Sequence, residues 1–190
     1  MEKLKMRTPD KTDQNIERIA KLFPNVVTET KDGILRIYLS GRRIFRLNSS
    51  PEVYVTFSWI NAIDASSGSE VIGQNTFMVD KLTVENSSGS TSHFEVECRD
   101  LEMHASSGST IRLSGSALNL IGKSSSGSTI KSQELKVVNA NLEVSSGATI
   151  HVGVSGELEA SASSGGSITY YGEAIPKLLR QSSGGDIRKR

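Results

Sequence analysis

The sequence predicts an all-β solenoid of about seven stacked turns, each called a rung below. A Ser-Ser-Gly tripeptide occurs seven times, its glycines are separated by 18 to 21 residues, and apolar residues recur at fixed distances from them. A period near nineteen residues over most of a chain is typical of solenoids. The seven glycines are Gly68, Gly89, Gly108, Gly127, Gly147, Gly165 and Gly184.

Three sets of positions around each glycine predict the core of the solenoid. Short stretches such as Leu82-Thr83-Val84 alternate with the period of two expected of strands. We therefore expect one strand before each glycine, a shorter strand after it, and columns of side chains stacked about 4.8 Å apart. The column three residues after the glycine contains Val71, Ser92, Ile111, Ile130, Ile150, Ile168 and Ile187. The columns seven and five residues before it contain Asn61, Leu82, Leu101, Leu120, Ala140, Leu158 and Lys177, and Ile63, Val84, Met103, Gly122, Leu142, Ala160 and Leu179.

The tripeptide itself predicts a corner, because glycine adopts a positive φ at little cost. The serine before each glycine is present in all seven repeats, and alternation predicts that it points inward and forms a ladder of satisfied hydroxyls. A nucleophilic serine would need one distinctive site with a base, which seven equal copies do not offer. These serines are Ser67, Ser88, Ser107, Ser126, Ser146, Ser164 and Ser183.

Residues 1–60 lack the repeat and are predicted to form an N-terminal cap on a solenoid of residues 61–190. Apolar residues at helical spacing predict a short helix over Asp13–Phe23. Two alternating stretches, Val26–Thr30 and Ile34–Leu39, flank Lys31-Asp32-Gly33 and predict a hairpin. A cap would cover the open first edge of the sheet, which otherwise invites aggregation.

The stretch Glu52–Ile60 also alternates and is expected to lead into the first rung. At the other end, the charges of Ile187-Arg188-Lys189-Arg190 are expected to discourage edge pairing.

Composition excludes several function classes. The formal net charge of +1 argues against bulk nucleic-acid binding. The lone Cys98 has no partner for a disulfide, and a buried apolar side chain is the expectation. No apolar run reaches the length of about 18 residues that a membrane span requires. The first residues, Met1–Lys5, lack the apolar core of a signal peptide.

One outward-facing pattern follows the glycines. Threonine stands two residues after four of them, and cations or histidines stand four residues after, so a threonine stripe should lie beside a basic stripe. We interpret this pair as a docking surface for an anionic polysaccharide or a cell-envelope protein. The plainer alternative is that β-branched residues suit strands and cations keep the sheet soluble. The residues are Thr91, Thr110, Thr129 and Thr149, and His93, Arg112, Lys131 and His151, with Arg188 at the end.

No catalytic residue, metal site or cofactor is predicted. His93 and His151 lie three rungs apart, or about 14 Å, which is too far for one metal ion. The strands before the glycines carry four carboxylates, which indicate a solvated acidic face rather than a catalytic cluster: Glu102, Glu143, Glu157 and Glu159.

Several segments together resemble the head GIN domain of putative auto-transporter adhesins. They are Ala65–Ser69, His104–Ser109, Glu159–Gly166 and Ile168–Gly172, with Thr28–Tyr38 similar to the hairpin upstream in that family. The resemblance covers roughly residues 13–190. It implies a right-handed β-helix-like fold, a location in the cell envelope or outside the cell, and no established catalytic residue to transfer.

The expected function is therefore a non-catalytic, adhesive surface module. Two alternatives stay open. One is a structural scaffold that polymerises end to end. In that case the chain would form a homo-oligomer. The other is a carbohydrate-active β-helix enzyme.

Overall fold

The computed structural model describes residues 3–7, 16–21, 26–40 and 52–190, and within them every regular element is a β-strand. Most strands belong to one sheet with the order β16-β14-β12-β11-β10-β9-β8-β6-β1-β4-β3, to which β7, β13 and β15 also pair, while β2 and β5 pair separately. The strands are Lys3–Arg7 (β1), Ile16–Lys21 (β2), Val26–Lys31 (β3), Ile34–Leu39 (β4), Val53–Phe57 (β5), Ala62–Ser66 (β6), Glu70–Ile72 (β7), Phe77–Asn86 (β8), Thr91–Ala105 (β9), Thr110–Ser124 (β10), Thr129–Val144 (β11), Thr149–Val154 (β12), Glu157–Ala162 (β13), Ser167–Tyr171 (β14), Ile175–Gln181 (β15) and Asp186–Lys189 (β16).

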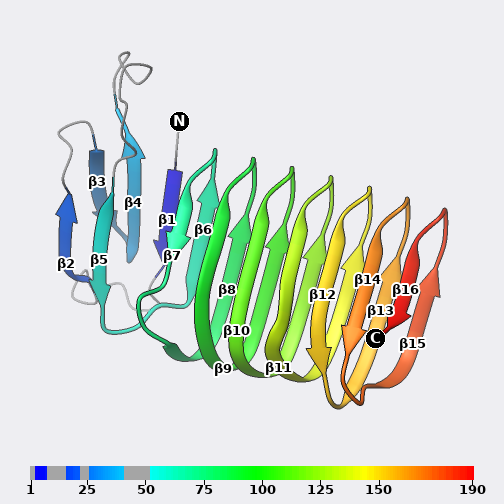
Figure 1. Ribbon diagram of the computed structural model, residues 1–190. Coiled ribbons are helices and arrows are strands. Elements are labelled where there is room, and N and C mark those ends of the chain that lie inside the picture. Colours follow the sequence, from blue (N-terminus) through cyan, green and yellow to red (C-terminus); the bar gives the residue numbers. More distant parts are fainter. Residues whose placement is uncertain (1–2, 8–15, 22–25, 41–51) are drawn as a thin grey trace.

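The stacked rungs confirm the predicted all-β solenoid, as Figure 1 shows. Strands of successive rungs pair in parallel, and the repeat brings equivalent residues into register. Ile111 lies beside Ile130, Ile130 beside Ile150, and Ile150 beside Ile168. The sequence period is therefore the length of one rung.

The predicted inward columns form the core. Ile111, Ile130, Ile150 and Ile168 are fully buried, as are most members of the other two columns. Burying one such side chain contributes roughly 1.5–3 kcal/mol. The last rung departs from the pattern, because Leu179 is 41% exposed there.

The Ser-Ser-Gly tripeptide forms a tight corner with two left-handed residues rather than one. The serine before each glycine has φ between 48° and 59°, and the glycine has φ between 68° and 76°. In the second rung, the Ser90 amide donates to the Ser87 carbonyl, which closes a four-residue turn. The Gly89 amide instead donates to the Ser107 carbonyl of the following rung. The corner thus joins neighbouring rungs as well as reversing the chain.

A ladder of buried serines is present, but the prediction assigned it to the wrong serine of each repeat. The serine before each glycine is exposed, because two successive left-handed residues interrupt the alternation. The inward serine is the one directly after the glycine, at Ser90, Ser109 and Ser128. Their hydroxyls donate to main-chain carbonyls one rung earlier, at 2.8–2.9 Å.

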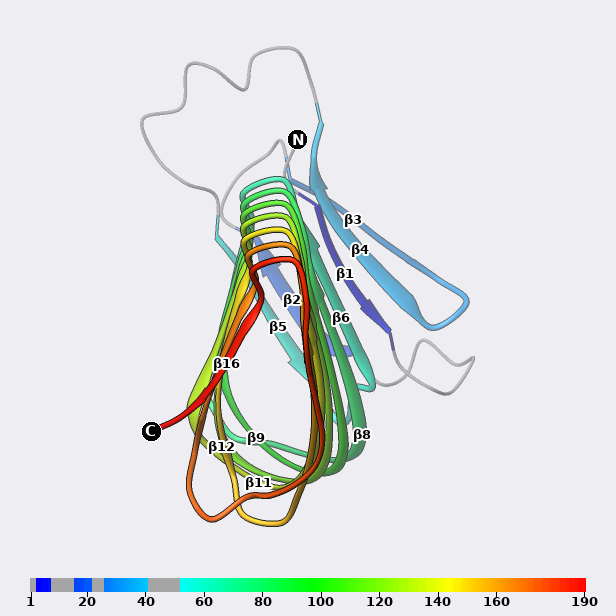
Figure 2. The ribbon, with the colours of Figure 1, turned by 90° about the vertical axis from the view of Figure 1, so that its right-hand side faces the viewer.

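A second bend lies at the other end of each rung. There two consecutive side chains point outward, such as Leu118 and Asn119, before inward alternation resumes at Leu120. Viewed along the solenoid in Figure 2, the rungs superpose, with the tight corners at the narrow end and the broader bends opposite.

The N-terminal part contains the predicted hairpin but a strand where a helix was expected. Strands β3 and β4 pair antiparallel around Asp32 and Gly33, whose φ values of 52° and 70° suit a hairpin turn. Residues 16–21 form β2, which pairs antiparallel with β5, so the helix prediction is wrong there. The rest of the predicted helix, 13–15 and 22–23, lies outside the described residues.

The first edge of the solenoid is covered on one side. Strand β1 lies between β6 and β4 and pairs antiparallel with both. Strand β5 is not part of the parallel ladder, although the Phe57 ring meets that of Phe77 edge-on at 5.3 Å. The division into a 1–60 cap and a 61–190 solenoid stays a prediction.

Candidate functional site

The face formed by the strands that follow each glycine is called the post-glycine face. It consists of β7, the first parts of β9, β10 and β11, and β12, β14 and β16. In-register pairing places Thr91, Thr110, Thr129 and Thr149 side by side as the threonine stripe. All four are partly exposed, so their methyl and hydroxyl groups are accessible along the axis.

The basic stripe lies two residues further along the same strands. Pairing aligns His93 with Arg112, Arg112 with Lys131, and Lys131 with His151. The first three are exposed and His151 is half-buried. The column is then interrupted by the buried Thr169 before it ends on Arg188.

The centre of the basic stripe has no internal counterion. Neither Arg112 nor Lys131 forms an ion pair with any residue in the described ranges, although both are exposed. Burial, followed by the positive charges of Lys131 and Arg190, lowers the pKa of His151. His151 is therefore mainly neutral at pH 7. Since Arg188 pairs with Asp186, the cations of the stripe that lack an ion pair within the described ranges are Arg112 and Lys131.

Acidic residues limit the stripe toward the first rungs. Glu95 and Glu97 are exposed on β9, and the Thr76 hydroxyl donates to Glu95 at 2.9 Å. Glu70 is exposed on β7, directly beside Thr91. The positive potential is consequently concentrated from Arg112 onward.

The opposite face, formed by the strands before each glycine, is called the pre-glycine face and has a different charge pattern. Two of its lysines pair with carboxylates of the adjacent rung: Lys123 with Glu143 at 4.0 Å and Lys177 with Glu157 at 3.1 Å. His104 Nε2 lies 2.8 Å from the Glu102 carboxylate. Lys123 and Lys177 on this face therefore have carboxylate partners, whereas Arg112 and Lys131 of the basic stripe have none among the described residues.

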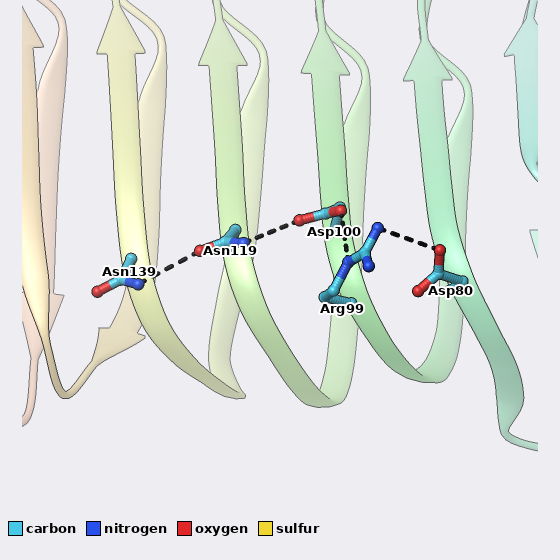
Figure 3. A network of polar contacts seen from close by, with 5 residues as sticks. All are labelled: Asp80, Arg99, Asp100, Asn119 and Asn139. Atoms are coloured by element: carbon cyan, nitrogen blue, oxygen red, sulfur yellow. Dashed lines mark hydrogen bonds and ion pairs between the residues drawn. The ribbon is translucent and has the colours of Figure 1, made fainter.

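A polar ladder missed by the sequence analysis lies at the second bend (Figure 3). Asn139 Nδ2 donates to Asn119 Oδ1 at 3.3 Å, and Asn119 Nδ2 donates to Asp100 Oδ1 at 2.8 Å. Arg99 bridges Asp100 and Asp80, at 3.0 and 3.2 Å. The hydrogen bonds from Asn119 and Arg99 lower the pKa of Asp100. Aligning the residue eight positions before each glycine would have revealed this column.

The described residues offer little for metal or thiol chemistry. They contain no group of three His, Cys, Asp or Glu side chains that could hold a metal ion. Cys98 is half-buried, and burial, with smaller effects of Asp100 and Asp80, raises its pKa to about 11. A thiol with so high a pKa is a poor nucleophile near pH 7. In the same ranges, no helix is long and apolar enough to cross a membrane.

The family follows from a comparison with family models. The model described as "Putative auto-transporter adhesin, head GIN domain" matches residues 3–174. The chain belongs to this family. The resemblance seen in the repeats and the hairpin is thereby confirmed. No curated protein matches this GIN domain.

Solved structures of similar fold come from Bacteroides and Parabacteroides. A putative adhesin from Bacteroides fragilis is 18% identical with a TM-score of 0.80, and the match covers 87% of this GIN domain and 77% of that chain. A putative adhesin from Parabacteroides merdae is 16% identical with a TM-score of 0.66, over 90% and 82% of the two chains. A protein from Parabacteroides distasonis described as a putative lipid binding protein is 15% identical with a TM-score of 0.56, over the same shares. At these identities the likeness shows the fold alone.

Proposed function

We propose that this GIN domain is a non-catalytic module of the cell envelope or cell surface that binds an anionic polysaccharide through its threonine and basic stripes. The observation that carries the proposal is the pair Arg112 and Lys131. They are adjacent, in register, exposed and without a counterion among the described residues. The description of the family as adhesins supports a role in attachment.

The stripe suits a polymer better than a small anion. Its positions recur once per rung, about 4.8 Å apart, so negative groups repeated along a chain can contact several positions together. Each exposed ion pair contributes little binding free energy, but a polymer that forms several of them at once binds more tightly. The adjoining threonines add hydroxyl groups that can exchange hydrogen bonds with sugar hydroxyls.

Two features favour a binding module over a polymerising scaffold. Strand β1 already occupies the edge of β6, so the pre-glycine sheet has no free edge there for another copy. At the other end, β15 and β16 carry the exposed charged side chains Lys177, Arg180 and Arg188, two of them paired with Glu157 and Asp186, and charged side chains on an edge strand discourage further strand pairing.

Retention on immobilised heparin tests the proposal. The wild type should be retained at low salt, and a variant combining Arg112→Glu with Lys131→Glu should flow through while keeping the wild-type melting temperature. The matched control combines Lys123→Glu with Lys177→Glu, which makes the same change in net charge on the pre-glycine face. The control should stay retained. Equal loss in both variants would show that net charge alone causes binding and would contradict the proposal.

A further inference from the structure

A groove of about 810 Å³ lies at the first rungs, where it runs from the pre-glycine face to the second bend. Its walls come from the segment after β5, from β6 and from β8, with Glu102 of β9 at one side. Trp59, Asn61 and Met78 line it together with acidic side chains. The groove plays no part in the proposed polysaccharide binding.

One wall of the groove is an open strand edge. Strand β8 pairs with β9 from Phe77 onward, whereas its pairing with β6 begins only where Thr83 lies opposite Ala62. Within the described residues, Phe77–Lys81 thus has a strand on one side only, and Met78 to Lys81 line the groove. An unpaired edge of this kind is the site at which an extended peptide adds a strand.

The other groups in the groove are mostly hydrogen-bond acceptors. Asp64, Asp80, Glu85 and Glu102 line it with carboxylates, against the single cation Lys81. Asp80 is already shared with Arg99, and Glu102 with His104, so among the side chains that the structure describes Asp64 and Glu85 retain the most free capacity. In addition, Asn61 Oδ1 is buried with no partner in the part of the chain that the structure describes. A buried acceptor without a donor costs free energy until a donor reaches it.

The apolar lining suits the stems of basic side chains. Met78 is 76% exposed although it stands in a strand, and Trp59 is half-buried beside it in the lining. Aromatic faces attract ammonium and guanidinium groups, and the aliphatic stems of lysine and arginine cover apolar surface. An acceptor-rich groove with an aromatic wall therefore favours a ligand that is rich in donors and positively charged.

We propose that this groove binds an extended basic segment of a partner protein, which adds as a strand to the Phe77–Lys81 edge of β8. Main-chain hydrogen bonds to that edge fix the register of the peptide relative to β8. Basic side chains meet Asp64 and Glu85, and one donor reaches Asn61 Oδ1. The Phe77–Val79 part of this edge pairs with Val96–Cys98 of β9, so the interface lies at the second bend of the first rungs, whereas Arg112 and Lys131 lie on β10 and β11.

The chain carries its own probe for the test, because Trp59 is its only tryptophan. A seven-residue peptide of alternating lysine and valine with blocked ends is titrated while Trp59 fluorescence is followed. We expect a saturable change that weakens with salt. An Asp64→Asn, Glu85→Gln variant should bind at least about fivefold more weakly, whereas the matched Glu134→Gln, Glu159→Gln variant should bind as the wild type does.

Two further ligands separate strand addition from other modes. Methylating alternate amides of the peptide gives two isomers of equal charge, and an added strand pairs through one set only. One isomer should lose about tenfold in affinity and the other should keep it. Equal binding of the two isomers, no saturable change with the parent peptide, or a response to cellohexaose in place of the peptide would overturn the proposal.

Discussion

The hydroxyl of Ser109 donates to the main-chain carbonyl of Asn86, one rung earlier, at 2.9 Å. The Ser109 hydroxyl oxygen also accepts a hydrogen bond from the Ser106 amide at 3.1 Å. Ser109 is almost fully buried, and its bond to the Asn86 carbonyl is shielded from water, whereas the bond from the Ser106 amide is part-buried. Ser90 and Ser128 repeat the arrangement, and together they fasten each corner to the rung before it.

Replacing this serine should weaken the solenoid without changing its shape. Ser109→Ala removes the hydroxyl from the Asn86 carbonyl and the Ser106 amide, which still bond each other at 3.0 Å, so it should lower the free energy of unfolding by about 1 kcal/mol. Alanine fits the column, since Ala148 occupies it two rungs later. Ser107→Ala, at the exposed corner of the same rung, should cost less than about 0.5 kcal/mol. Equal losses in urea denaturation would contradict the ladder.

The corner shows where the sequence ceases to determine the direction of a side chain. The inward columns could be predicted because alternation holds within each strand. At the tripeptide, Ser107 and Gly108 are both left-handed, so counting by twos across the corner assigns the wrong serine. In four of the seven repeats serine stands on both sides of the glycine, so the pattern of residue types does not by itself show which serine points inward.

The left-handed serines also predict a stabilising substitution. Ser126 has φ of 53° and an exposed side chain, and Asn-Gly is the preferred pair for turns with two such residues. Ser126→Asn should raise the free energy of unfolding by about 0.5–1 kcal/mol. Ser126→Val, which is β-branched, should lower it by at least about 1 kcal/mol. Melting temperatures that change in the reverse order would contradict the corner geometry.

Adjacent residues on β11 should respond oppositely to charge. Ile130 is fully buried between rungs, whereas Lys131 is exposed beside it. Ile130→Asp buries a carboxylate without a partner and should cost more than about 4 kcal/mol, enough to unfold the domain. Lys131→Asp should cost less than about 1 kcal/mol. Coincident thermal melts of the two variants would be incompatible with the rung model.

The N-terminal part could be predicted only where a local signal decides the structure. Asp32-Gly33 specifies a hairpin by itself, and the hairpin is present. Ile16, Ile19 and Ala20 are compatible with a helical face, but pairing with β5 selects a strand. Such pairing depends on residues about 35 positions away, so a local periodicity does not reveal it. The stripes, in contrast, follow directly from the repeat, and their residues lie in the predicted register; their role in binding stays a prediction.

Cys98 should react slowly in the folded protein. Its pKa is raised to about 11, mainly by burial, so little thiolate is present at pH 8. Iodoacetamide should label the native protein many times more slowly than the protein in denaturant, where the side chain is exposed and its pKa returns toward the ordinary value. Equal rates in the two states would place the thiol at the surface and require a different packing of β9.

The salt dependence of binding to heparin tests most directly whether the stripes act together. For the wild type, the logarithm of the dissociation constant should rise linearly with the logarithm of salt concentration. Arg112→Glu and Lys131→Glu alone should each reduce both the affinity and this slope in part, and the double variant should lose nearly all of both, because the charges act additively within a Debye length of about 8–10 Å. A single variant that abolishes binding, or slopes that do not change, would contradict a docking surface built from in-register columns.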